Sequence, residues 1–389
     1  MTNTGPASAP KRLLSLDLMR GITIAFMIMV NNTGGGAWAQ MRHAAWNGMT
    51  ATDLVFPAFL FVVGVSIVFA YATRQKRGDS RVSLAWHTLR RAATLFLLGI
   101  VVNGFPSFHL DHLRIYGVLQ RIAVCYLMVG LFYLCDQRVW TKVAALACAL
   151  VGYWVLVQWV PVPGAGVPGR DVALLDKDQN IVAWVDRHVM PGHLYQEAPL
   201  YNTRDPEGLL SDIPAVGTTL LGLLAGMWLS SQREAKAKAL GLAAGAAACL
   251  ASGYLWSIWL PLNKKMWTSS YTLAAAGWTL AALALIFWAV DLRGWGREGW
   301  SKKLAWPWQV FGSNAITAYM ISELLIGVLG WIHFTVNGQP VTLLSFVYSK
   351  IFQPISDSGW RALIFSVSYT AVCFVPVWQL YRKKIFIKV

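Results

Sequence analysis

The sequence predicts an all-α membrane protein, a polytopic bundle of about ten transmembrane helices, or eleven if one further apolar stretch also spans. Of the 389 residues 56% are hydrophobic and only 13% are charged, whereas a soluble domain carries about 25% charged residues to keep its surface wet. The apolar residues also fall in long runs separated by short basic clusters. Length and composition therefore argue against two or three soluble domains.

Ten segments have the length and composition of a spanning helix. The hydrocarbon core of a bilayer is about 30 Å thick, and crossing it takes roughly 20 mostly apolar residues in a helix that satisfies its own backbone groups. The segments are 13–33, 52–73, 84–103, 115–135, 139–160, 213–231, 238–260, 271–291, 307–332 and 361–381. The stretch 341–355 contains Lys350 and Pro354, and we expect it to be an interfacial helix or half-helix.

The basic residues predict the orientation of these spans. Lys and Arg outnumber Asp and Glu by 33 to 18, but they flank alternate loops, which is the pattern of membrane topology and not of nucleic-acid binding. An even number of spans then places both termini in the cytoplasm. The predicted domains are a cytoplasmic tail at 1–12 and a single transmembrane domain at 13–389, with an extracytoplasmic cap at 161–212. Lys264 and Lys265 are an exception, because they fall on the outer side.

Several polar side chains lie inside predicted spans, where a charge costs about 2.5–3.5 kcal/mol and is retained when it is paired or functional. Asp17 and Arg20 are three residues apart on one helix face, which fits either a self-satisfied ion pair or a ligand site. Arg121 has no acidic residue nearby in the sequence, so we expect it to bind an anion or a distant carboxylate. Asn314 and Glu323 share a later span, and Glu323 needs a partner for its buried carboxylate.

The densest polar region is the first external turn, NNTGGGAWAQMRHAAWNGMTATDLVFP. Gly34 to Gly36 form a turn or allow the backbone to approach a ligand closely. Thr52 and Asp53 have the positions of helix N-cap and first-turn residues for the next span, and capping alone could explain them. His43 is the one group of the turn with an unperturbed pKa near neutrality, about 6.5. A structural and a catalytic histidine are both open here. The neighbouring polar residues include Asn31, Asn32, Asn47, Thr50 and Thr52.

No metal site or disulfide framework is expected. The cysteines lie inside apolar runs without a CxxC pair, and His109 and His112 in FHLDHLR form a weak metal pattern that we interpret as a solvated loop. Motifs of nucleotide hydrolases, zinc proteases and serine hydrolases are absent from the sequence.

Five blocks of sequence resemble the heparan-α-glucosaminide N-acetyltransferase family. They read LDLMRGITIAFMIMVNNTGGG, RHAAWNGMTATDLVFPAFLFVVGVSI, GVLQRIAVCY, DPEGLLSDIPAVGTTLLGLLAG and FGSNAITAYMISELL. The blocks extend from the first predicted span to the ninth, and the strings HAAWNG and GVLQRIA are the most specific. Among bacterial proteins, the chain resembles the NagX-type inner-membrane proteins of aminosugar metabolism.

The resemblance implies that cytoplasmic acetyl-CoA donates an acetyl group to the amine of a glucosamine-type sugar on the other side of a bacterial inner membrane. It places the family's active-site histidine on His43 and its active-site asparagine on Asn32. It also implies a homodimer as a possible assembly, with membrane lipid around it. The amino-terminal luminal domain of the lysosomal members precedes the membrane part, whereas here the first span begins about ten residues into the sequence. The acceptor therefore stays open between a long polysaccharide, which would use such a domain, and a free or short aminosugar, which would not.

Acyl transfer to an amine needs a base and donors for the developing oxyanion. His43 fits the base, and Asn32 fits either a donor to the thioester oxygen or a group that orients the amine. Asp53 or Glu323 would hold the imidazole tautomer or bind the substrate ammonium. Direct attack in a ternary complex is the preferred mechanism, and an acetyl-His43 intermediate is the alternative. We assign Asn47 with Glu323 to the sugar, and Arg121, Arg20 and Asn314 to the path of CoA.

Two other classes of function remain open at this stage. A transporter of an aminosugar would also use the charged residues inside the spans as a substrate or proton path, but a carrier's site is expected near the membrane midplane. A scaffold without a ligand is the third reading, and it leaves those buried charges unexplained.

Overall fold

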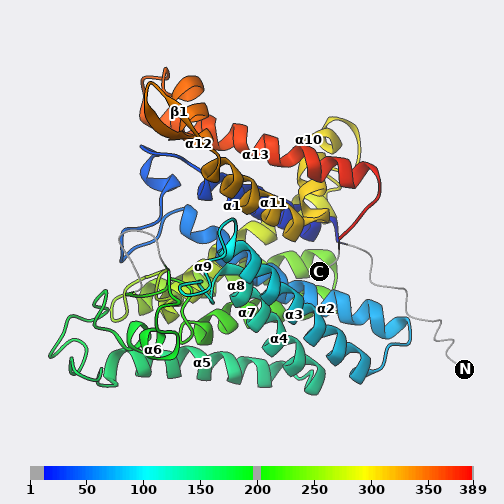
Figure 1. Cartoon of the computed structure of the whole chain (residues 1–389). Coiled ribbons are helices and arrows are strands. Elements are labelled where there is room, and N and C mark those ends of the chain that lie inside the picture. Colours follow the sequence, from blue (N-terminus) through cyan, green and yellow to red (C-terminus); the bar gives the residue numbers. More distant parts are fainter. Residues whose placement is uncertain (1–12, 196–202, 388–389) are drawn as a thin grey trace, which may run out of the picture.

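The computed structural model describes residues 13–195 and 203–387, so the predicted tail at 1–12 lies outside the described residues. The described chain is a helical bundle with one small hairpin (Figure 1). Its first half contains α1 (Leu14–Asn31), α2 (Val55–Lys76), α3 (Arg81–Gly104), α4 (Val118–Cys135), α5 (Val139–Trp159) and the short α6 (Ile181–Val189). Two 3-10 turns, η1 (Ala39–Met41) and η2 (Thr52–Leu54), lie between α1 and α2.

The second half is helical as well. It contains α7 (Asp212–Ser230), α8 (Ala235–Trp256), α9 (Ser269–Phe287) with the π-helical η3 (Trp288–Leu292), α10 (Gly299–Ser313), α11 (Ala315–Trp331), α12 (Leu343–Val347) with the π-helical η4 (Tyr348–Phe352), and α13 (Ser358–Arg382). Strands β1 (His333–Val336) and β2 (Gln339–Thr342) pair antiparallel. The sequence analysis did not predict this hairpin, although its two-residue Asn337–Gly338 turn, with both φ angles positive, is a strong hairpin signal.

All ten predicted spans coincide with helices. Within the described residues, eight helices are long and apolar enough to cross a membrane, and the pair α10 and α11 makes a ninth if it counts as one span. The predicted span 84–103 corresponds to α3, which falls outside this set and carries Arg90 and Arg91 within it. The stretch 341–355 forms a short apolar helix at Leu343–Phe352. These helices identify an integral membrane protein.

The predicted continuous helix at 307–332 is wrong. The chain bends by 78° between α10 and α11, at Asn314, whose φ of −135° and ψ of 47° are not helical. The Asn314 side chain explains the break, because it binds the backbone near the carboxyl terminus. Its Oδ1 accepts a hydrogen bond from Ile387 N at 2.9 Å, and its Nδ2 donates to Ile385 O at 3.1 Å.

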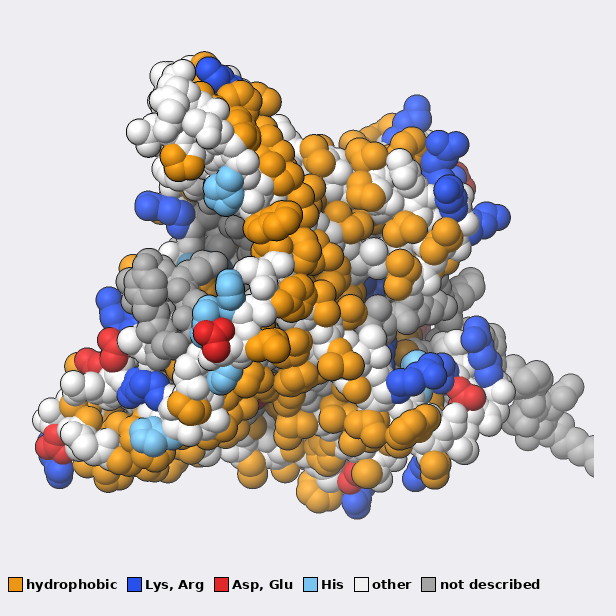
Figure 2. Space-filling view, viewed as in Figure 1, with side chains coloured by type: hydrophobic (Ala, Val, Ile, Leu, Met, Phe, Trp, Pro, Cys, Tyr) orange, Lys and Arg blue, Asp and Glu red, His pale blue; other side chains and the backbone are white. Residues whose placement is uncertain are grey.

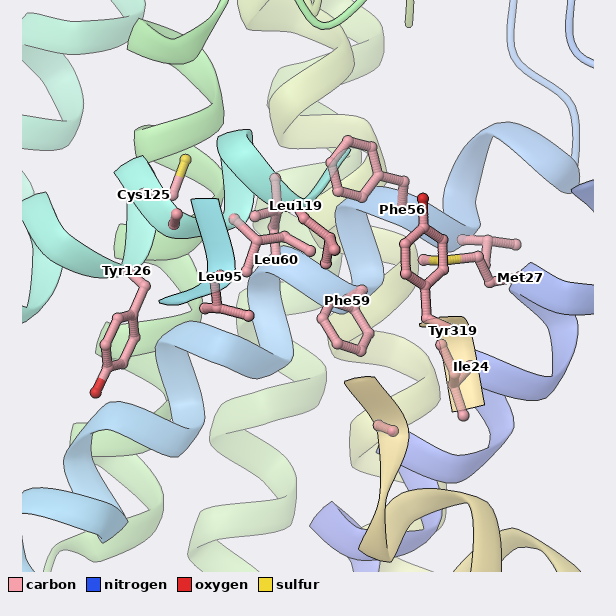
Figure 3. Close-up of a cluster of buried hydrophobic side chains, with 14 of the residues drawn as sticks. Ile24, Met27, Phe56, Phe59, Leu60, Leu95, Leu119, Cys125, Tyr126 and Tyr319 are labelled. Carbon is pink, nitrogen blue, oxygen red and sulfur yellow. The ribbon is translucent and has the colours of Figure 1, made fainter. Parts of the chain in front are cut away.

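The core lies where α1, α2, α3, α4 and α11 meet. Figure 3 shows Phe56, Phe59 and Leu60 of α2 between side chains of α1 on one side and of α3 and α4 on the other. Backbones approach closely where α2 crosses α7. A Cβ on Gly222 would lie 2.0 Å from Phe61 O, and a Cβ on Gly64 would lie 2.1 Å from Thr219 O, so only glycine permits this packing.

The outer helices expose apolar side chains, as lipid-facing helices do. Only 17% of the apolar window of α5, and the same share of α8, is buried. Figure 2 shows hydrophobic side chains over the middle of the molecule, with Lys and Arg gathered towards its margins.

The order of the helices defines two ends of the bundle. We call the end where residues 32–54 join α1 to α2 the His43 end, and the end where α1 begins the Leu14 end.

Candidate active site

His43 and Asp53 form a hydrogen-bonded pair at the His43 end. The imidazole Nδ1 lies 2.6 Å from Asp53 Oδ1, and Asp53 is 1% exposed while the histidine side chain is 41% exposed. A carboxylate accepts hydrogen bonds, so Nδ1 carries the proton that is donated to it, and Nε2 keeps its lone pair. The pair therefore presents a base on a ring that a substrate can reach.

The local fold of residues 40–54 holds this carboxylate in place. Asp53 Oδ2 accepts hydrogen bonds from Ala44 N, Thr50 N and Thr50 Oγ1, each at 3.0 Å. Asp53 lies in the first turn of η2, as predicted, but these donors precede it in the chain, so capping of the helix does not explain its carboxylate. Thr52 instead donates from Oγ1 to Gln40 O at 3.0 Å. The carboxylate thus faces the imidazole, because the loop fixes its other oxygen.

A positive charge from a distant part of the sequence acts on His43. The pKa of His43 is lowered from its ordinary value, first by the charge of Lys264 and then by burial, while Asp53 and Glu207 oppose the shift. Lys264 Nζ lies 3.7 Å from Glu207 Oε1. Glu207 also accepts a hydrogen bond from Arg114 Nη2 at 2.7 Å. The imidazole is therefore held in its neutral form, which is the form a general base needs.

The other predicted site residues of this end are engaged elsewhere. Asn32 is 8% exposed, and its Nδ2 donates to Ile28 O at 2.9 Å. Across the described ranges, no hydrogen bond joins Asn32 to His43. Asn47 Oδ1 accepts a hydrogen bond from Asn263 Nδ2 at 3.1 Å. Glu323 Oε1 accepts one from Asn31 Nδ2 at 3.4 Å, so Glu323 lies beside the end of α1.

The glycine run is a turn that packs against the carboxyl-terminal third of the chain. Gly34 and Gly36 have φ angles of +66° and +83°, which L side chains rarely adopt. A Cβ on Gly34 would lie 2.7 Å from the ring of Tyr348, and one on Gly36 would lie 2.5 Å from Ser358 Cβ. The run thus lets the loop after α1 approach η4 and the start of α13.

Arg121 binds a distant carboxylate, which is one of the two partners that the sequence analysis expected for it. Arg121 Nε lies 3.0 Å from Asp212 Oδ1 at the start of α7, and Nη2 donates to Gly208 O at 3.0 Å and to Ser211 Oγ. The guanidinium also lies over the ring of Trp267. Arg121 is therefore part of the fold of the His43 end. These contacts of Arg121 do not support the predicted direct role of this residue in binding CoA.

Arg121→Gln is expected to destabilise the protein strongly, because Asp212 would remain buried without its charge partner. Breaking one side of a buried ion pair costs about 3–5 kcal/mol. Thermal unfolding in detergent should show a large loss of stability. Arg20→Gln is the matched control, since Arg20 is about a quarter exposed and should cost much less. A stability loss no larger than that of Arg20→Gln would contradict this assignment.

The other residues assigned to the path of CoA lie near the Leu14 end. Arg20 pairs with Asp17 at 3.4 Å and donates to Ser66 Oγ at 2.8 Å, so the predicted ion pair is confirmed. Asn314 binds the carboxyl-terminal backbone, as described above. Near them is a cavity of about 650 Å³ between α1, α10 and α13. Its lining includes Leu14, Asp17, Trp306, Trp378, Arg382 and Lys384.

A cluster of charged residues beside His43 was not predicted from the sequence. Arg114 donates to both carboxylate oxygens of Asp205, at 2.8 and 2.5 Å, and links Asp205 to Glu207 and Lys264. Two signals could have revealed it. Lys264 is a basic residue on the outer side of the predicted topology, and Asp205 and Glu207 lie in the acidic loop 161–212.

His109 and His112 lie in the loop between α3 and α4, a different segment from the His43–Asp53 pair, which we call the dyad. His109 and His112 stack with ring centroids 5.2 Å apart, and with Asp111 they bring three ligand atoms within 4.8 Å of one another. All three residues are exposed, which agrees with the interpretation of a solvated loop.

The fold and the site define an integral membrane protein with a hydrogen-bonded histidine–carboxylate pair at one end of its bundle. Residues 12–186, which include the dyad, match the family model described as "Heparan-alpha-glucosaminide N-acetyltransferase, catalytic". The chain is 29% identical to the human heparan-alpha-glucosaminide N-acetyltransferase and 28% identical to the mouse protein of the same name, over 98% of its own length in each case. It spans 61% of the length of these curated relatives. The chain is thus a distant homologue of these transferases.

Proposed function

We propose that this protein is a transmembrane acyltransferase that moves the acetyl group of acetyl-CoA to the amine of a glucosamine-type sugar. The observation that carries the proposal is the His43–Asp53 pair, which leaves Nε2 as a base in the part of the chain that matches the catalytic family. The alternative of an aminosugar transporter has less support, because a carrier's site is expected near the midplane and the dyad lies at one end of the bundle.

In the proposed reaction the neutral amine attacks the carbonyl carbon of the thioester. As the C–N bond forms, the nitrogen loses a proton to Nε2 of His43, while Nδ1 keeps its hydrogen bond to Asp53. The tetrahedral intermediate then collapses, the C–S bond breaks, and the imidazolium returns its proton to the departing sulfur. The products are the N-acetylated sugar and CoA, and His43 ends neutral as it began.

The basic residues at the Leu14 end support the entry of acetyl-CoA, the acetyl donor, from that end. Arg382, Lys384 and the indole rings of Trp306 and Trp378 line the cavity there, and they suit the phosphates and the adenine ring of CoA. The basic clusters of the sequence support a cytoplasmic position for this end through the positive-inside rule. The acceptor amine would then meet His43 on the outer side, with the pantetheine arm passing between the helices.

The proposal predicts acetylation that depends on both substrates. Purified protein in detergent is supplied with acetyl-CoA and glucosamine, and N-acetylglucosamine and free CoA are measured by mass spectrometry. We expect one CoA for each N-acetylglucosamine and little CoA without the amine. Release of one equivalent of CoA per protein in the absence of amine would favour an acetyl-His43 intermediate instead. Failure to bind acetyl-CoA at all would contradict the proposal and favour the transporter.

A further inference from the structure

Lys264 lies in a turn that is joined to the His43 loop by three separate contacts. Gly48 N donates to Leu262 O at 2.7 Å, Asn263 Nδ2 donates to Asn47 Oδ1 at 3.1 Å, and Lys265 Nζ donates to Ala45 O at 3.0 Å. The residues on both sides of Lys264 are therefore bound to the segment that follows His43. This turn, residues 261–268 between α8 and α9, therefore packs against the loop that carries His43.

The turn itself is rigid. Asn263 is fully buried, and its Oδ1 accepts from Met266 N at 2.9 Å while its backbone N–H donates to Thr268 Oγ1 at 3.1 Å. Trp267 has a φ of +51°, an unusual conformation for a large side chain that its buried packing maintains. The backbone that carries Lys264 is thus fixed before any substrate binds.

The Lys264 ammonium has unused hydrogen-bonding capacity. Its side chain is only 12% exposed, and its contact with Glu207 at 3.7 Å is an ion pair beyond hydrogen-bond distance. Among the residues that the structure describes, none accepts a hydrogen bond from this ammonium. Glu207 is meanwhile bonded to Arg114, so its charge is already shared. A nearly buried cation with free donors is suited to an oxygen on which negative charge develops.

We propose that Lys264 is a catalytic residue whose ammonium donates a hydrogen bond to the acyl oxygen of the thioester beside His43. This inference rests on the acyl transfer proposed above. Negative charge moves onto that oxygen as the amine adds to the carbonyl carbon, and it returns when the C–S bond breaks. Lys264 gains and loses no proton in the cycle. His43 moves the proton, and Lys264 stabilises the oxyanion.

The charges that face His43 make the role of Lys264 measurable. Asp53 from η2 and Glu207 from the loop before α7 favour the protonated ring, while Lys264 disfavours it and has the largest influence. Removing the Lys264 charge should therefore raise the pKa of His43. The acid limb of the kcat/KM profile reports the pKa of this base, so the limb should move to higher pH.

The test compares Lys264→Met, Lys264→Arg and Lys302→Met by acetyl transfer to glucosamine across pH. For Lys264→Met we expect kcat to fall about 10²-fold, the typical cost of one oxyanion donor, and the acid limb to move to higher pH. Lys264→Arg should keep the limb near its wild-type position and recover part of kcat. Lys302→Met removes the same charge from an exposed position of α10 and should leave the limb in place.

A readout without substrate separates this inference from the proposed function. Carbethoxylation of His43 with diethyl pyrocarbonate depends on its neutral fraction, and peptide mass spectrometry can follow its pH dependence in wild type and Lys264→Met. If folded Lys264→Met keeps its kcat, or loses kcat with both pH profiles unmoved, the inference is overturned. Another outcome is that wild type acetylates no amine while the carbethoxylation profile of Lys264→Met differs from that of wild type. In that case the proposed function is wrong, but the effect of the Lys264 charge on the pKa of His43 is confirmed.

Discussion

His43→Ala should lose about 10²- to 10⁴-fold in the rate of acetyl transfer to glucosamine, the usual contribution of a positioned general base. The alanine leaves no group to take the proton that the amine loses on attack. The side chain is 41% exposed, so its removal should cost little stability, and acetyl-CoA should still bind. The measurement is kcat for N-acetylglucosamine formation, with acetyl-CoA affinity and thermal unfolding determined on the same preparation.

His333→Ala is the matched control for this change. His333 is an exposed residue of β1 whose Nδ1 contacts only Trp331 O among the hydrogen bonds described for it. We expect wild-type kcat for the control. Transfer by folded His43→Ala at a rate within a few-fold of wild type would remove the assignment of the base, and sugar uptake by proteoliposomes that survives the same change would favour a transporter.

Asp53→Asn is expected to reduce kcat by up to about 10⁴-fold, because it reverses the tautomer of His43. Ala44 N, Thr50 N and Thr50 Oγ1 all donate to Oδ2, so an asparagine would place its carbonyl oxygen there. Its NH₂ group would then face His43 Nδ1 and donate to it. The ring proton would move to Nε2, the position from which the base must act.

The asparagine preserves the shape and the three donors of the loop, so the loss should appear in kcat with little change in thermal stability. Asp79→Asn makes the same chemical change in the connection between α2 and α3, where Asp79 pairs with Arg74, and should leave kcat unchanged. A fully active Asp53→Asn protein would show that the carboxylate has no part in orienting His43. Loss of the folded state would instead assign Asp53 to the structure of the loop.

Much of the architecture follows from hydrophobic length alone. Nine of the ten predicted spans each coincide with one helix, and the span 307–332 forms two, because a run of about 20 apolar residues has few ways to satisfy its backbone outside water. The break within the predicted span 307–332 is caused by a side chain. Asn314 breaks its span by bonding to Ile385 and Ile387, whose backbone comes from the far end of the chain. Short-range pattern analysis cannot anticipate such a partner, since the apolar run itself continues through the bend.

The candidate site was predictable in part. His43 stood out as the one group in its turn that titrates near neutrality, and Asp53 lies only ten residues later. Their geometry was not predictable, since a residue in the position of Asp53 fits a helix cap equally well. Arg121 was assigned to the donor path because its partner, Asp212, is 91 residues away.

The sequence by itself determined that this chain is an all-α membrane protein, which segments are helical, and that His43 is a candidate base. Those properties depend on composition, apolar run length and intrinsic pKa, which are local. The tertiary structure alone decided that Asp53 orients the imidazole, that Asp212 neutralises Arg121, and that Lys264 and Glu207 lie beside the site. These are pairings between charged groups far apart in the chain, and their energies depend on distance and burial, which exist only after the helices have packed.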